Sequence, residues 1–88
     1  MKQQRIDDYE GHPTIAWRYE SAEERAYYAP YLEPDIGAKR VTYPTADCSH
    51  VLTFETAELL ERHWQALHDL TQNIAQLWRL RCALGAID

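Results

Sequence analysis

The chain of 88 residues lacks the features that mark several large classes of protein. Its two cysteines, Cys48 and Cys82, are too few for the disulfide framework of a small secreted fold. The first residues are polar, unlike a signal peptide, and no apolar run reaches the roughly 18 residues that cross a membrane. We therefore expect a cytoplasmic protein whose cysteines are reduced.

Positive charge is also scarce. Nine Lys and Arg stand against 14 Asp and Glu, which gives a net charge of −5, and the basic residues form no run. Nucleic-acid binding depends on cations that neutralise phosphates, so this balance disfavours direct binding of DNA or RNA. It favours a protein partner with a basic surface, such as a nucleic-acid-binding protein, although modest acidity also keeps a small protein soluble.

The signatures of cofactor binding and catalysis are missing as well. The three glycines stand far apart, so there is no phosphate-binding glycine loop and no dinucleotide fingerprint. No Ser-His-Asp arrangement is recognisable. We expect no cofactor, no bound metal and no enzymatic activity.

One short segment leaves an alternative open. Cys48 and His50 are two residues apart, and with His12, His63 or Cys82 they could complete a tetrahedral zinc site. Zinc frameworks usually show two close pairs of ligands, and here there is one. A Cys48 thiolate with His50 as its base is the catalytic version of the same idea. A small thiol-dependent or metal-dependent protein is therefore the alternative function.

The 29 residues from Thr56 to Leu84 contain no Gly or Pro and predict one long C-terminal helix with Thr56 as its N-cap. Residues 71–73 are weaker helix formers, which leaves open a break there and a helical hairpin. Two apolar stripes follow helical spacing. The first is Leu60, Trp64, Leu67, Thr71, Ile74 and Trp78, and the second is Leu59, Ala66, Leu70, Leu77, Leu80 and Leu84, with His63 and Asn73 in register.

So long a helix exceeds what a small sheet covers, and its uncovered part predicts a homodimer. Either stripe could face the sheet. Within the first stripe we assign the dimer interface to Leu60, Trp64, Leu67, Ile74 and Trp78. The alternative is that the helix, with Arg79 and Arg81 near its end, serves a small DNA-binding regulator.

The rest of the chain predicts a small antiparallel sheet of about three strands, in the order β-α-β-β-α, within one α+β domain spanning residues 1–88. The expected strands are 14–20, 39–43 and 50–54, with a possible extra edge strand at 5–10 in a weakly patterned N-terminus, residues 1–13. A short helix is expected at 22–29, where Ser21 and Glu24 form a capping box and Pro30 ends the helix.

Tyrosines and acidic residues gather between residues 23 and 35, which is typical of a protein-binding surface. The expected partner-binding residues are Glu23, Glu24, Tyr27, Tyr28, Tyr31, Glu33 and Asp35. The hypothesis is a non-enzymatic inhibitor or adaptor that binds a larger protein. Small size and acidity are also typical of phage or mobile-element inhibitors that block a host nucleic-acid-binding complex, such as anti-CRISPR proteins.

Overall fold

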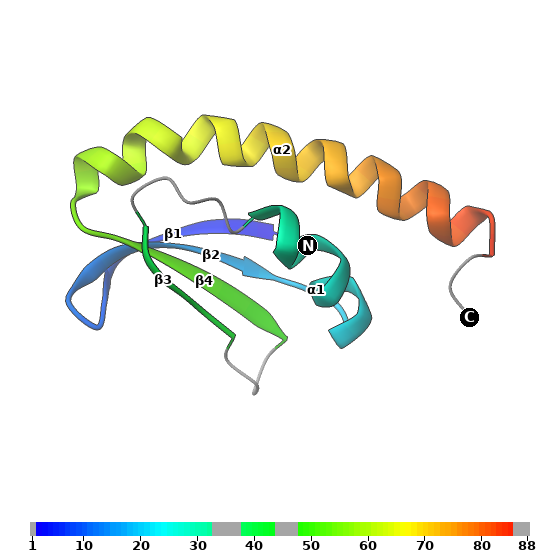
Figure 1. The fold of residues 1–88 in the computed structure, drawn as a ribbon, viewed down its shortest axis with the longest axis horizontal. Helices are drawn as coiled ribbons and strands as arrows, with labels where there is room; N and C mark the ends of the chain where they lie inside the picture. The colour runs from blue at the N-terminus through cyan, green and yellow to red at the C-terminus, as the bar shows by residue number, and fades with distance from the viewer. Residues whose placement is uncertain (1, 33–37, 44–47, 86–88) are drawn as a thin grey trace.

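The computed structural model describes residues 2–32, 38–43 and 48–85. The elements run in the order β1 (Lys2–Tyr9), β2 (His12–Arg18), α1 (Ala22–Tyr28), a 3-10 turn η1 (Ala29–Leu32), β3 (Ala38–Thr42), β4 (Ser49–Phe54) and α2 (Ala57–Ala83). The strands form one antiparallel sheet ordered β1-β2-β4-β3, and α2 lies across one of its faces (Figure 1). The predicted α+β class is confirmed, with four strands instead of about three.

The extra strand is β1, where the hydrophobic pattern was weakest. It pairs with β2 from Lys2↔Arg18 to Ile6↔Thr14, and the register then shifts before Tyr9↔His12. Gly11 has a φ of +84° in the connecting turn, and its amide donates to Asp8 Oδ1 at 2.8 Å. Pairing along nearly its whole length thus holds this polar strand at the sheet edge, beginning three residues earlier than predicted.

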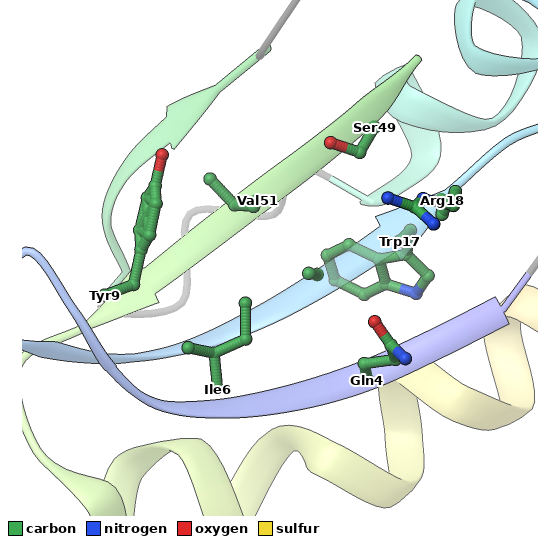
Figure 2. A pocket seen from close by; sticks show the side chains of 8 residues that line it. Gln4, Ile6, Tyr9, Trp17, Arg18, Ser49 and Val51 are labelled. Atoms are coloured by element: carbon green, nitrogen blue, oxygen red, sulfur yellow. The ribbon is translucent and has the colours of Figure 1, made fainter. Parts of the chain in front are cut away.

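The two faces of the sheet differ in side-chain size because residue type alternates along the central strands. The inward residues of β2 and β4, together with Tyr19, are large and form the core: Ile15, Trp17, Tyr19, His50, Leu52 and Phe54. Most outward residues are small, namely Thr14, Ala16, Ser49, Val51 and Thr53, and the exception is Arg18 at the end of β2. No described helix covers this outer face, and between its edges lies a hollow of about 360 Å³ (Figure 2).

The first helix begins as the capping box predicts, with one change. Ser21 Oγ accepts from the Glu24 amide at 3.1 Å, but the Glu24 carboxylate accepts from the Glu20 amide and not from Ser21. The α-helix ends at Tyr28, and the chain continues through η1 with Pro30 inside it. Proline stops the α-helical hydrogen bonding here without ending the helical course of the chain.

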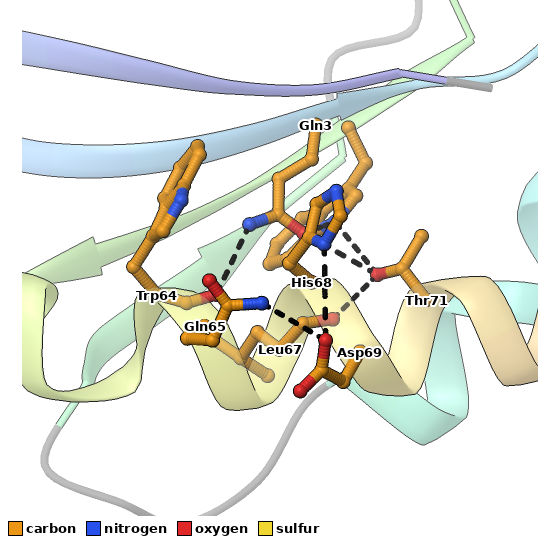
Figure 3. Close-up of polar contacts among 8 residues, drawn as sticks. Gln3, Trp64, Gln65, Leu67, His68, Asp69 and Thr71 are labelled. Carbon is orange, nitrogen blue, oxygen red and sulfur yellow. Dashed lines mark hydrogen bonds and ion pairs between the residues drawn. The ribbon is translucent and has the colours of Figure 1, made fainter.

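A polar network fixes α2 along the sheet (Figure 3). The buried Trp17 indole N–H donates to Gln3 Oε1 at 3.0 Å and to Thr71 Oγ1 at 3.2 Å. Thr71 Oγ1 in turn donates to the Leu67 carbonyl at 2.7 Å, and Gln3 Nε2 reaches the Trp64 carbonyl at 3.4 Å. Because these donors and acceptors come from β1, β2 and α2, the network sets which helical residues face the core.

The long helix is unbroken, so the alternative of a hairpin at residues 71–73 is wrong. Thr56 Oγ1 caps it by accepting from the Leu59 amide at 3.1 Å, as predicted, and Gly85 leaves it with a φ of +69°. At 1.5 Å per residue its 27 residues span about 40 Å, close to the 41 Å longest dimension of the molecule. Its last turns therefore project beyond the sheet (Figure 1). No helix among the described residues has the length and apolar character needed to cross a membrane.

Candidate functional site

The first stripe of α2 faces the sheet. Leu60, Leu67 and Ile74 are at most 3% exposed, and Trp64 and Trp78 are partly buried against the same core. These are the five residues that we expected at a dimer interface. Their side chains already pack inside one chain, so a second copy would find most of that surface occupied.

The second stripe points away from the core, and its exposure rises along the helix. Leu59 and Leu70 still pack at the edge of the core. Leu77, Leu80 and Leu84, on the projecting turns, are 53%, 57% and 75% exposed. Exposed leucines in one row are unusual for a monomer, whereas single ones are common. These three leucines are the large apolar side chains of the second stripe that stay exposed.

The tyrosine-rich surface predicted at residues 23–35 is divided by the fold. Glu24 and Tyr28 are buried, at 7% and 2% exposure. Burial, and to a smaller extent the negative charge of the nearby Glu24, raises the pKa of Tyr28 to about 12. Both residues therefore serve the fold. Glu23 and Tyr31 are exposed, and Tyr27 is partly buried. Glu33 and Asp35 lie outside the described residues.

What remains of that surface joins the projecting end of α2. The Tyr27 ring lies 5.2 Å from the Trp78 ring and 6.1 Å from the Tyr31 ring. The Arg81 guanidinium lies 5.5 Å over the Tyr27 ring, a cation–π arrangement. The local character is aromatic and cationic, and thus differs from the acidic surface that the sequence predicted.

The fold instead assembles an acidic surface at the opposite end of the molecule. The β1–β2 turn and the start of α2 lie at the same end (Figure 1), and Arg5 of β1 forms an ion pair with Glu61 of α2. The exposed acidic residues of this acidic end are Asp7, Asp8, Glu10, Glu55, Glu58 and Glu61, with Arg5 and Arg62 among them. Sequence reasoning missed it because these residues come from segments about 50 positions apart, and only the sheet order brings them together.

The Cys48–His50 pair is not arranged for thiol chemistry. His50 is fully buried, its ring stacks on Trp17 at 4.6 Å, and its Nδ1 lies 2.8 Å from the Tyr19 hydroxyl. Burial lowers the His50 pKa to about 4, so the ring is neutral near pH 7. Among the described residues, no three His, Cys, Asp or Glu side chains are grouped to hold a metal ion.

His63 of α2 makes contacts within the fold. Its Nδ1 lies 2.9 Å from the Leu59 carbonyl, and its ring stacks near Phe54 at 5.9 Å between centroids. These contacts make His63 part of the fold. Within the described part of the chain it does not belong to a group of metal-ligand side chains.

Comparison with known proteins gave no match to a family model, a curated protein or a solved structure. The arguments about function therefore rest on the surfaces of this chain alone.

Proposed function

We propose that the protein is a non-enzymatic interaction module, an inhibitor or adaptor that self-associates through the second stripe of α2 and binds a larger protein with a basic surface. The observation that carries this proposal is the row of Leu77, Leu80 and Leu84, each more than half exposed on a helix end that projects from the domain. A row of this length in water is stabilised when another apolar surface covers it.

The spacing of the second stripe suits a second copy of the same helix. Two series repeat every seven residues, as in a coiled coil: Leu59, Ala66, Asn73, Leu80 and His63, Leu70, Leu77, Leu84. If two helices run antiparallel about the point between Thr71 and Gln72, each exposed leucine meets a residue of the other half. The facing pairs are then Leu84 with Leu59, Leu80 with His63, Leu77 with Ala66, and Asn73 with Leu70.

Charge favours the antiparallel direction. In the first half of α2, Glu58, Glu61 and Asp69 outnumber Arg62, while Arg79 and Arg81 stand in the second half without an acidic residue. Antiparallel helices place the basic half of one copy along the acidic half of the other. Their dipoles then point in opposite directions, which also favours this arrangement. Parallel helices would bring like charges together at both ends.

The first experiment measures the mass of the intact chain by light scattering during gel filtration. The measured mass of the wild type should be twice its chain mass of 10.3 kDa. The measured mass of Leu80→Asp should be that of a monomer, because a dimer would bury the new charge in the interface. Gln72→Asp is the matched control, since it adds the same charge at an exposed position of the same helix, about 80° or more around the axis from each exposed leucine. A wild-type monomer would overturn self-association.

Orientation can be tested by cross-linking in a chain whose Cys48 and Cys82 are changed to serine. A mixture of Ala66→Cys and Leu77→Cys chains should oxidise to a covalent dimer, because these positions face each other in the antiparallel pair. Ala66→Cys alone should not, because its two copies would lie about 16 Å apart along the axis. Efficient cross-linking of Ala66→Cys alone would indicate parallel helices.

The partner is tested by affinity capture from a lysate of the native host, with eluates identified by mass spectrometry. The acidic end supports a basic partner, so triple replacement of Asp7, Asp8 and Glu58 by their amides should weaken capture, and added salt should weaken it further. Glu23→Gln, on α1 at another part of the surface, is the single-charge control. A partner retained equally by the triple variant in high salt would contradict the charge argument.

The structure offers less to the alternative of a DNA-binding regulator. Arg79 and Arg81 are two residues apart, which places them about 200° apart around the helix. Arg81 lies over Tyr27, so the two cations do not form one row facing a phosphate backbone. Retention of the protein on immobilised DNA at low salt would favour this alternative instead.

A further inference from the structure

The outer face of the sheet has a floor of small side chains, although no described helix covers it. Ala16 and Val51 are paired neighbours at its centre and are 8% and 3% exposed. Larger side chains from the sheet edge and the strand ends line the hollow above this floor, among them Ile6, Tyr9 and Arg18. The result is the hollow of about 360 Å³, within the range of about 300–1,000 Å³ that small-molecule sites occupy.

The walls of the hollow differ in chemistry from one end to the other (Figure 2). Ile6 and the Tyr9 ring border one end and are apolar or aromatic. Gln4, Arg18 and Ser49 border the other end and supply an amide, a guanidinium and a hydroxyl. The strand register causes this division, because Arg18 pairs with Ser49 at one end of β2 while Tyr9 pairs with His12 at the other.

We propose that this hollow binds a small organic anion: a flat apolar ring system that carries one acidic group. The ring would lie over Ala16 and Val51 beside Tyr9, where aromatic contact and burial of apolar area are both available. The acidic group would lie toward Arg18, whose guanidinium donates charge-assisted hydrogen bonds to carboxylate, sulfonate or phosphate oxygens. Arg18 therefore places a guanidinium at one end of the hollow in a protein of net charge −5.

Two probes with the same rings test the proposal. Anilinonaphthalene sulfonate carries an acidic group, and phenylnaphthylamine is its uncharged counterpart. Amide NMR spectra of the full chain should shift for Gln4, Ile6, Ala16 and Val51 as either probe is added, with tighter binding of the sulfonate. Shifts confined to the exposed leucines of α2, or no shift at all, would overturn the proposal.

Variants separate the two ends of the hollow. Arg18→Gln should weaken the sulfonate about fivefold and leave the neutral probe unchanged, as expected for one exposed ion pair. Arg79→Gln removes the same charge on α2 and should change neither affinity. An equal loss for both probes in Arg18→Gln, or a loss in Arg79→Gln, would contradict the assigned anion position.

A second pair of variants tests the hollow itself. Ala16→Ile should abolish binding of both probes by filling the floor, and Tyr9→Ala should weaken both by removing one wall without touching the floor. The amide spectrum of each variant reports whether the fold is kept, and Tyr9→Ala decides the matter if Ala16→Ile does not fold. Unchanged binding in a folded variant of either kind would place the probes elsewhere.

Discussion

The two ends of α2 are built from the same residue types but meet different surroundings. Over the sheet, Leu60 and Leu67 lie in the core at 0% and 3% exposure. On the projecting turns, Leu77 and Leu80 are more than half exposed. The comparison teaches that helix formation and core formation are separate properties of this sequence. The helix runs on for about two turns after its last buried residue, Ala75.

A helix end without cover is expected to be marginal in water, because most helical stability in proteins comes from packing of an apolar face. Here Trp78 and Tyr27 still contact each other near that end, and Gly85 ends the helix through its positive φ. The remaining leucines, Leu77, Leu80 and Leu84, are the apolar side chains at this end that the described residues do not bury. That difference separates residues that maintain the fold from residues available for function.

Truncating one leucine at each end should give the largest contrast. Leu67→Ala should lower the free energy of unfolding by about 2–5 kcal/mol, because it removes buried contacts and leaves a cavity. Leu80→Ala should change it by about 0.5 kcal/mol or less when measured at a protein concentration where the chain is monomeric. Urea unfolding of both variants provides the test. Equal losses would mean that the projecting turns are packed in solution.

The fold was largely predictable, and the reasons are local. Alternation of large and small residues marked β2 and β4, and the cap at Thr56 marked the start of α2. The face of α2 was not predictable, because both stripes carry enough leucine to bury. The structure decides between them through Thr71 on the first stripe, whose hydroxyl accepts from the Trp17 indole; the second stripe has Asn73 in the matching turn.

The candidate site was predictable only in part. Glu23 and Tyr31 are exposed, as a binding surface requires, but Tyr28 packs in the core with its ring 6.3 Å from the Trp78 ring. The acidic end and the hollow both depend on strand order and register. Those are long-range pairings that a weak strand such as β1 does not reveal by its own pattern.

Lowering the pH should reduce the stability of the fold through His50, whose ring is buried in the core. Its pKa falls from 6.5 to about 4 in the folded chain because burial disfavours the charged ring. Between these values the unfolded chain binds a proton that the folded chain does not, so this contribution to stability is complete above pH 6.5 and is lost as pH falls toward 4. The loss from pH 7 to pH 5 should be about 2 kcal/mol.

Chemical denaturation at several pH values measures this effect as a difference between variants, because carboxylates titrate in every variant alike. His50→Phe keeps a ring against Trp17 and should flatten the pH dependence by that amount, whatever its stability at pH 7. The wild type, measured in the same buffers, gives the reference slope. The same slope in His50→Phe would contradict the assignment.

A smaller effect is expected from the hydrogen bond that selects the buried face. Thr71→Val preserves shape but removes the hydroxyl that accepts from the Trp17 indole and donates to the Leu67 carbonyl. Gln3 still accepts from the indole, so the expected loss is about 1 kcal/mol and not the larger cost of an unsatisfied buried donor. Urea unfolding measures the loss. The double variant with Gln3→Ala should lose more than the sum of the singles, because the indole N–H would then have no protein acceptor.

The smallest effect should come from the matching polar contact on the solvent side of the same helix. Gln65 Nε2 donates to Asp69 Oδ1 at 2.9 Å, one turn along, and this hydrogen bond is exposed (Figure 3). Gln65→Ala should change the free energy of unfolding by no more than about 0.5 kcal/mol, since water replaces the lost partner and alanine favours the helix. Thr71→Val and Gln65→Ala each remove a side-chain hydrogen bond made within one turn of α2, so their difference measures the effect of burial. If both cost the same, the network at Trp17 would not be what orients the helix, and packing of Leu67 and Ile74 alone would have to do so.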